Sequence, residues 1–182
     1  MPNNPKKVLV ISNMYPSIKD PYYGTFVKAF FDDLQKSNDF EPFLIAINGR
    51  KYSLLAKTWA YIIFYCRIIW TVSLYKFDLI YTHTISHPTP PLRLISFFKN
   101  LNTIYNIHGD DLLTTTSLAS KLLKFSIPLL KSSKAIVVPS EYFRDVLIKK
   151  IPFTIEKKII ISPSGGVSSI FLVKLLKLMT TP

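Results

Sequence analysis

The sequence has a single cysteine, so a disulfide within the chain is excluded. Cys66 lies in an aromatic and aliphatic segment, where a free thiol usually packs as a small apolar side chain, and we therefore expect it in the core. Histidine is also rare, with three in the chain. Neither the histidines nor the cysteine show a short ligand spacing such as C-x-x-C or H-E-x-x-H, so no metal site is predicted.

Glycine is scarce as well. The chain has five glycines and contains no G-x-G-x-x-G or Walker-type loop, which removes two common phosphate-binding signatures. Ser140 is not part of a G-x-S-x-G sequence, so it is not predicted to be a hydrolase nucleophile. The apolar run at residues 8–11, which follows Lys6 and Lys7, is too short for a secretory signal, and we expect a cytoplasmic protein.

Acidic residues are few. The chain has 11 of them against 23 lysines and arginines, a net charge of +12, and Asp78 is the only acid between Pro42 and Gly109. A field of that sign attracts anions, which include nucleic acid, an anionic membrane surface and phosphorylated substrates. Charge alone does not choose among these. Because no recognisable nucleic-acid-reading element is present, we do not expect nucleic acid as a partner.

What the sequence does contain is an alternation of strand and helix patterns. Residues 8–11 form a continuous apolar run, typical of a strand buried on both faces, and apolar residues recur at helical spacing from Thr25. Further strand patterns lie at 43–47, 79–82, 103–107, 135–138 and 158–161, and helix patterns at 54–74, 92–98, 118–130 and 141–149. The alternation predicts an α/β fold: a single Rossmann-like domain with helices on both faces of a doubly wound, mainly parallel sheet.

In such a sheet, ligands bind beyond the carboxyl ends of the strands. Gly24 stands at the start of the first helix, where free N–H groups and the helix dipole can hold a phosphate; a simple turn is the alternative interpretation. Ser140 follows the fifth strand and is expected to cap the helix after it.

Two histidines follow neighbouring strands of the predicted sheet. His83 comes after the third strand and His108 after the fourth. A histidine at a strand end can exchange protons near neutral pH, and either Asp110 or Asp111 could orient His108. A hydrogen-bonded histidine that only caps its strand is the alternative.

Taken together, the loops resemble those of family-4 glycosyltransferases. The segments that carry the resemblance are V-L-V-I-S-N-M-Y-P with P-Y-Y-G-T-F-V, D-L-I-Y-T-H, I-H-G-D-D, V-V-P-S-E and I-S-P-S-G-G-V. They occur in order, from about Lys7 to Phe171, with plausible spacing, and this is far more specific than any one of them alone.

The resemblance implies a GT-B fold, in which two Rossmann-like domains face a cleft and a sugar passes from a nucleotide diphosphate donor to an acceptor with retention at the anomeric carbon. The nucleotide-sugar is a substrate, so no cofactor and no metal are implied, and the acceptor is a glycan or a lipid-linked molecule, as in cell-surface polysaccharide synthesis. The resemblance also implies that Gly24 lies against the donor diphosphate and that His108 reaches the transferred sugar as a catalytic residue. Tyr23, His83 and Asp111 would line the rim of the cleft.

Two segments depart from the family's pattern. The family's loop usually reads H-G-S-D, where this chain has Asp110, and the hinge P-N-G-V-D loses its acidic residue within residues 164–171. We expect residues 1–171 to form the amino-terminal, acceptor-side domain and residues 172–182 a short tail. No E-x7-E signature of the donor-binding domain occurs, so we expect a truncated chain that is inactive alone. A separately encoded carboxyl-terminal domain, which would make a split enzyme, is the alternative.

The rival function of another class is a non-catalytic module that sits on a membrane or binds a lipid-linked partner. Within Leu54–Leu74, Trp59 and Trp70 flank Arg67 in a stretch without acids, which suits a helix lying on the cytoplasmic face of a membrane. The apolar run is too short and interrupted to span a bilayer. Burial of this helix in the core is the alternative interpretation.

Overall fold

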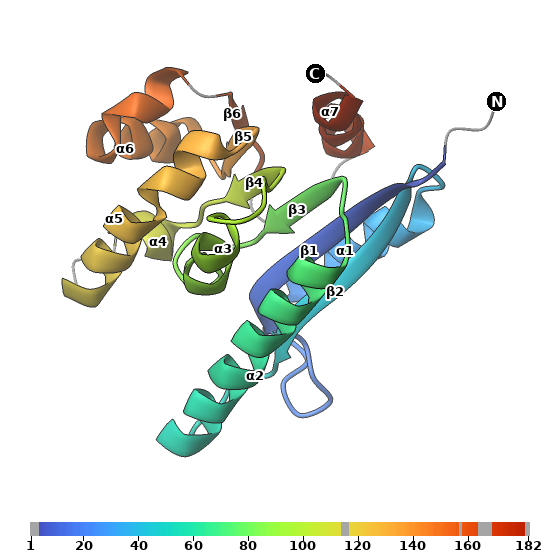
Figure 1. Cartoon of the computed structure of the whole chain (residues 1–182), viewed down its shortest axis with the longest axis vertical. Coiled ribbons are helices and arrows are strands. Elements are labelled where there is room, and N and C mark those ends of the chain that lie inside the picture. The colour runs from blue at the N-terminus through green and yellow to red at the C-terminus, as the bar shows by residue number, and fades with distance from the viewer. Residues whose placement is uncertain (1–3, 114–116, 157, 164–168, 181–182) are drawn as a thin grey trace.

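A computed structural model of the chain describes residues 4–113, 117–156, 158–163 and 169–180 (Figure 1). The strands are β1 (Lys6–Tyr15), β2 (Phe40–Asn48), β3 (Leu79–Thr82), β4 (Thr103–Asn106), β5 (Ala135–Val138) and β6 (Ile159–Ile161). The helices are α1 (Thr25–Lys36), α2 (Leu54–Leu74), α3 (Thr89–Ile95), α4 (Gly109–Leu113), α5 (Ser117–Ser132), α6 (Glu141–Lys150) and α7 (Ser169–Thr180), with a 3₁₀ turn, η1 (Pro152–Glu156).

The six strands form one sheet in the order β2-β1-β3-β4-β5-β6, and every neighbouring pair is parallel. The predicted parallel α/β fold is confirmed. Strand β1 is longer than the predicted 8–11, because β2 pairs with it as far as Tyr15 opposite Asn48, through an irregularity after Ser12. An apolar run marks the buried part of a strand, whereas the pairing partner decides where the strand ends.

Helices cover both faces of the sheet. Side chains of β1 alternate between the two faces, so Val8 and Val10 contribute to one core and Leu9 and Ile11 to the other. Helices α1 and α7 pack on the first face, through Val27, Phe30, Leu34, Leu175 and Leu178. Helices α2, α3, α5 and α6 pack on the second, through Phe64, Ile68, Val72, Leu92, Ile95, Leu129, Leu130 and Leu147. The sheet is therefore doubly wound, as predicted.

The carboxyl-terminal segment, expected as a short tail, contains α7. Leu175 and Leu178 of this helix are 1% and 6% exposed and belong to the same core as α1. Residues 164–168, which carry the hinge-like sequence, lie outside the described residues.

Helix α2 has the predicted bounds, but the prediction that Cys66 is buried was wrong, because its side chain is exposed. The helix buries a stripe formed by Phe64, Ile68 and Val72, and Cys66 lies outside it. Because α2 is apolar on nearly every side, its composition does not indicate which side the sheet covers. In the described part of the chain, no helix is long and apolar enough to cross a membrane.

Candidate functional site

The loops that follow the strands meet at one edge of the sheet. Strands β1, β3, β4 and β5 run the same way, so the residues at their carboxyl ends share that edge. Asn13 lies near the end of β1, His83 follows β3, His108 follows β4 and Ser140 follows β5. These residues therefore lie on one edge, as the strand–helix alternation predicts for residues that follow parallel strands, and the arrowheads of β3 and β4 in Figure 1 show the common direction.

His83 and His108 are in contact at this edge. Their imidazole rings lie 6.4 Å apart between centroids and at 13° to each other. Phe26, in the first turn of α1, touches both, with centroid distances of 5.7 Å to His83 and 5.0 Å to His108. Phe30, one turn further along α1, lies 5.0 Å from the His83 ring. The start of α1 therefore covers the histidine pair.

His83 is an uncharged, buried ring. Its side chain is 2% exposed, and burial, followed by the proximity of His108, lowers its pKa to about 3. Its Nδ1 lies 3.5 Å from Nδ2 of Asn106, and an amide that donates there leaves the proton on Nε2. Among the described residues Nε2 has no hydrogen-bond partner, although it is buried. The His83 ring therefore packs against the His108 ring and is shielded from proton exchange with solvent.

Gly24 fixes the start of α1 against β1. It is the N-cap residue, in the left-handed region with φ 75° and ψ 28°. A Cβ at this position would lie 2.8 Å from the carbonyl carbon of Met14, so both the conformation and the space require glycine. Helical hydrogen bonds begin at Val27, whose N–H donates to the Gly24 carbonyl. The N–H groups of Thr25 and Phe26 precede that ladder and form the positive end of the helix dipole.

Asp111 ties two loops of the site together. It is 9% exposed, and one carboxylate oxygen accepts from the Ser86 hydroxyl at 2.7 Å and from the Ser86 N–H at 3.3 Å. The other oxygen accepts from the N–H groups of Ile85 at 3.4 Å and of His108 at 3.3 Å. Asp111 therefore positions the backbone of His108, where the sequence hypothesis had a carboxylate orienting the ring. The side chain of Asp110 lies outside the described residues.

Tyr23 stands beside Gly24, where the loop between β1 and α1 meets the end of β2. The guanidinium of Arg50 lies 5.2 Å from the centre of the Tyr23 ring and 3.6 Å from the carboxylate of Asp20. Burial raises the pKa of the Tyr23 phenol, and the charge of Arg50 opposes that rise. The half-buried phenol is thus uncharged near neutral pH and can donate a hydrogen bond.

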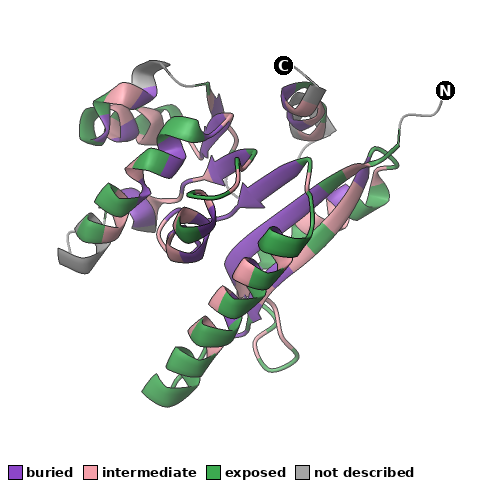
Figure 2. Cartoon of the chain, in the orientation of Figure 1, coloured by how far each residue is buried: buried purple, intermediate pink, exposed green. Residues whose placement is uncertain are grey.

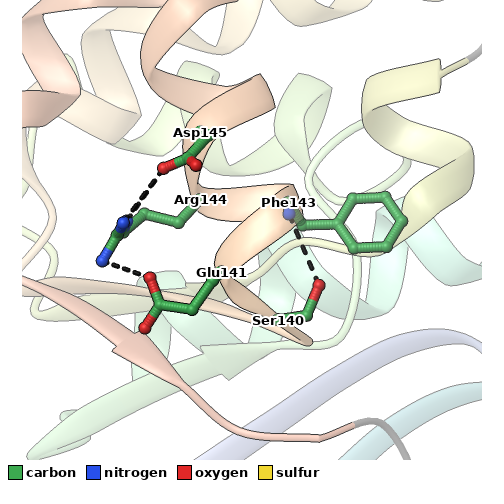
Figure 3. A network of polar contacts seen from close by, with 5 residues as sticks. All are labelled: Ser140, Glu141, Phe143, Arg144 and Asp145. Carbon is green, nitrogen blue, oxygen red and sulfur yellow. Dashed lines mark hydrogen bonds and ion pairs between the residues drawn. The ribbon is translucent and has the colours of Figure 1, made fainter.

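Ser140 caps α6, as the sequence predicts. Its Oγ accepts from the N–H of Phe143 at 3.5 Å (Figure 3). In the same helix Arg144 pairs with Glu141 and with Asp145, the latter at 3.1 Å. These contacts serve the beginning of the helix, and the acid in the first turn also suits the helix dipole.

Sequence reasoning missed Phe26 and Asn106. Phe26 reads as one more apolar position of a helix, and Asn106 as the last residue of a strand, so neither pattern distinguishes them from structural residues. Their positions in the predicted fold could have indicated a role at the site, since Phe26 is in the first turn of a helix that begins at the ligand-binding edge. In the described part of the chain, no three His, Cys, Asp or Glu side chains converge as a set that could hold a metal ion.

Residues 24–165 match the sequence pattern of the family described as Glycosyltransferase Family 4. That segment contains Gly24, His83, His108, Asp111 and Ser140, and so most of the site. None of the curated proteins matches the sequence.

Among solved structures, the chain is similar to the crystal structure of UDP-GlcNAc 2-epimerase from Neisseria meningitidis bound to UDP-GlcNAc. The TM-score is 0.53 at 17% sequence identity, and the match covers 96% of this chain and 50% of that one. At this identity the likeness shows the fold alone. The chain therefore spans half the length of a protein with the same kind of Rossmann-like sheet.

Proposed function

The chain belongs to glycosyltransferase family 4, and from that premise we propose that it forms the acceptor-side wall of a cleft in which a sugar passes from a nucleotide-sugar to a glycan or lipid-linked acceptor. One observation carries the proposal: the start of α1 and His108 come together at the carboxyl edge of the sheet, joined through Phe26. An anion-binding helix start beside an imidazole is the pair of groups needed at the leaving diphosphate and at the transferred sugar.

We assign each residue a role from its contacts. The first N–H groups of α1, set in place by Gly24, receive the donor diphosphate, and His108 hydrogen-bonds the transferred sugar. Tyr23 forms the rim beside the helix start. His83 and Asp111 act from beneath, the first by packing on the His108 ring and the second through the His108 backbone. The proposed reaction retains the configuration at the anomeric carbon, and it uses the nucleotide-sugar as a substrate without a metal or another cofactor.

The second wall of the cleft would come from another Rossmann-like domain, whether in the same polypeptide or in a separate one. Negative charge that develops on the leaving diphosphate has to be met by preorganised groups on both sides. The 50% coverage of the epimerase is consistent with one such half. We therefore propose that these 182 residues do not transfer sugar by themselves.

We further propose attachment to the cytoplasmic face of a membrane through α2, as suits a lipid-linked acceptor in cell-surface polysaccharide synthesis. The outer side of this helix leaves Trp59 63% exposed, Trp70 68% and Leu74 59%. Exposed tryptophans beside the cations Lys57 and Arg67 are typical of helices that lie in the headgroup region of a bilayer.

The test of the proposed reaction is an assay of the purified 182-residue chain with nucleotide-sugars, alone and with a donor-binding domain from a family member added as a fusion. We expect transfer only in the fusion, with retention seen in the anomeric proton signal of the product. His108→Ala should reduce turnover of the fusion by about a hundredfold or more. His87→Ala is the matched control, because the His87 ring packs on Tyr61 of α2, at 5.2 Å between centroids. Equal rates for His108→Ala and the parent would make His108 a structural cap, and transfer by the isolated chain would contradict the two-wall proposal.

A further inference from the structure

Two segments far apart in the sequence carry exposed apolar side chains at the carboxyl edge of the sheet and contact each other there. One is the loop 17–23 between β1 and α1, and the other is 50–59, which leads into the first turns of α2. We call this surface the tip. Its exposed large side chains are Ile18, Tyr22, Tyr52, Leu54, Leu55 and Trp59. Figure 1 shows the loop and the amino-terminal end of α2 projecting from the same end of the sheet.

Direct contacts hold the two segments together. The N–H and guanidinium of Arg50 both lie beside the Asp20 carboxylate, at 3.2 Å and 3.6 Å, and the same guanidinium lies over the Tyr23 ring. Gly49 has φ 64°, and a Cβ there would lie 2.4 Å from Oγ of Ser17, so the glycine lets the loop approach closely. The two segments are therefore fixed to each other at their bases, through Asp20, Tyr23 and Arg50.

The apolar side chains of the tip are left open to solvent by the described part of the chain. Ile18 is 102% exposed, Leu54 80% and Leu55 78%, and residues 51–59 are all exposed. The buried residues of α2 begin only at Phe64, and the first turns of the helix, residues 54–59, are exposed and extend past the sheet (Figure 2). Monomeric proteins rarely leave a contiguous patch of large apolar side chains in water unless it binds something.

The charge of the tip indicates what kind of partner binds it. The tip carries the cations Lys19, Arg50, Lys51 and Lys57, and its one acid, Asp20, is paired with Arg50. A second copy of this chain would bring the same positive charge and be repelled. The tip combines three kinds of side chain that suit an anionic bilayer surface. Aliphatic side chains can enter the acyl region, tyrosine and tryptophan rings suit the headgroup region, and lysines pair with anionic headgroups.

We propose that the tip inserts into the headgroup region of an anionic bilayer, so that the β1–β2 end of the carboxyl edge lies at the lipid and the rest of the edge remains open to the second wall of the cleft. The inference rests on the membrane attachment proposed above and narrows the contact from the whole outer side of α2, which includes Trp70 and Leu74, to the first turns of the helix and the loop 17–23. In this way it fixes the orientation. If the whole outer side of α2 lay on the membrane, the site would face along the membrane plane. Insertion of the tip instead brings Tyr23 and His108 close to the bilayer. A sugar acceptor carried on a lipid then reaches the site by lateral diffusion.

The two tryptophans of the chain, both in α2, test this orientation. Trp59 belongs to the tip and Trp70 lies near the other end of the helix, so Trp70→Phe and Trp59→Phe each leave one reporter. The chain is mixed with vesicles of phosphatidylcholine and phosphatidylglycerol in which the phosphatidylcholine carries brominated acyl chains. We expect strong quenching and a blue shift for Trp59 and little change for Trp70. Equal quenching of both would mean that α2 lies flat and would overturn the tip orientation while leaving membrane attachment intact.

Paired variants test the surface itself in vesicle flotation. Ile18→Ser with Leu54→Ser removes two exposed side chains of the tip, and we expect vesicle binding to weaken by about tenfold or more. Leu94→Ser with Phe98→Ser is the matched control, since both side chains are exposed, at 50% and 87%, and line a pocket with Ile69 and Leu74 near the opposite end of α2. This control should bind as the parent does. Greater loss in the control pair would overturn the inference. Failure of the parent to float with anionic vesicles would contradict membrane attachment altogether, and a tip variant that changes only the oligomeric state would identify a protein partner instead.

Discussion

The imidazole rings of His83 and His108 lie nearly parallel, at 13° to one another, with Phe26 of α1 against both. The His83 ring is buried, so a proton on it would lose its hydration and would also lie close to His108. The more deeply buried ring, His83, is therefore the one whose protonation should oppose folding.

The stability of the chain should decrease with acidification because of His83. The pKa of His83 in the folded protein is about 3, below the value of about 6.5 for an exposed histidine. Between these values the unfolded chain binds more protons than the folded one, so the free energy of unfolding rises with pH and falls as pH falls below about 6.5. We expect this group to lower the free energy of unfolding by about 2 kcal/mol between pH 7 and pH 5, measured by urea denaturation.

The matched variant for this measurement is His83→Gln, which keeps a polar side chain that does not titrate. Its free energy of unfolding should vary less between the two pH values, and the difference from the parent isolates His83. His87 contributes in the same direction in both proteins, because burial lowers its pKa as well. A parent and a variant with the same pH dependence would contradict the assignment of His83 as a buried neutral ring.

Asp111→Asn should destabilise the protein by about 1 to 3 kcal/mol. The carboxylate accepts from three backbone N–H groups and one hydroxyl, and an amide replaces one of its two accepting oxygens with a donor. Thermal or urea unfolding measures the effect. Asp145→Asn is the control, since Asp145 is exposed and its partner among the described residues is Arg144 of the same helix, and it should change stability by less than about 0.5 kcal/mol. Similar losses in both variants would mean that Asp111 does not hold the loops together.

Cys66 should react with a maleimide in the native protein without denaturant, because its side chain is exposed on α2. Mass spectrometry of the labelled chain gives the extent of reaction with time. As a control, Phe64→Cys in a Cys66→Ser background places the thiol on the buried side of the same helix, where Phe64 is 2% exposed. That thiol should react at least tenfold more slowly, in proportion to local opening. Equal rates at the two positions would contradict the orientation of α2.

Much of the fold could be predicted because strands buried on both faces have continuous apolar runs. β3, β5 and α2 have the bounds expected from the sequence, and one direction for all strands follows from the strand–helix alternation. The orientation of α2 could not be predicted. Its segment is apolar on nearly every side, so the position of Cys66 depended on where the sheet lies and not on any periodicity in the helix.

The site was predicted as a set of positions and not as a set of contacts. His83 and His108 follow neighbouring strands, and that topology alone brings them to one edge. The interactions between them come from other elements, since Phe26 reaches the pair from α1 and Asp111 bonds the backbone of His108. Such contacts depend on tertiary packing, which spacing along the chain does not encode.

Gly24→Ala should destabilise the protein by about 2 to 3 kcal/mol, measured by urea denaturation. The φ of 75° disfavours any residue with a Cβ, and the added methyl would lie 2.8 Å from the carbonyl carbon and 2.9 Å from the carbonyl oxygen of Met14, which are backbone atoms that cannot rotate away. The helix start would have to move off β1, and Phe26 would move with it, so the imidazole proton signals of His83 and His108 should shift as well.

Gly109→Ala is the matched glycine control. Gly109 has no positive φ, and its Cβ would first meet the Cζ atom of Phe143 at 3.2 Å, the far end of a side chain that can rotate. Its cost should stay near or below about 1 kcal/mol. If the two alanine variants lost the same stability, the close approach of Gly24 to Met14 would not be what fixes the start of α1. The anion-binding role proposed for that helix start would then lose one of its supports, because this approach holds the N–H groups of Thr25 and Phe26 against the end of β1.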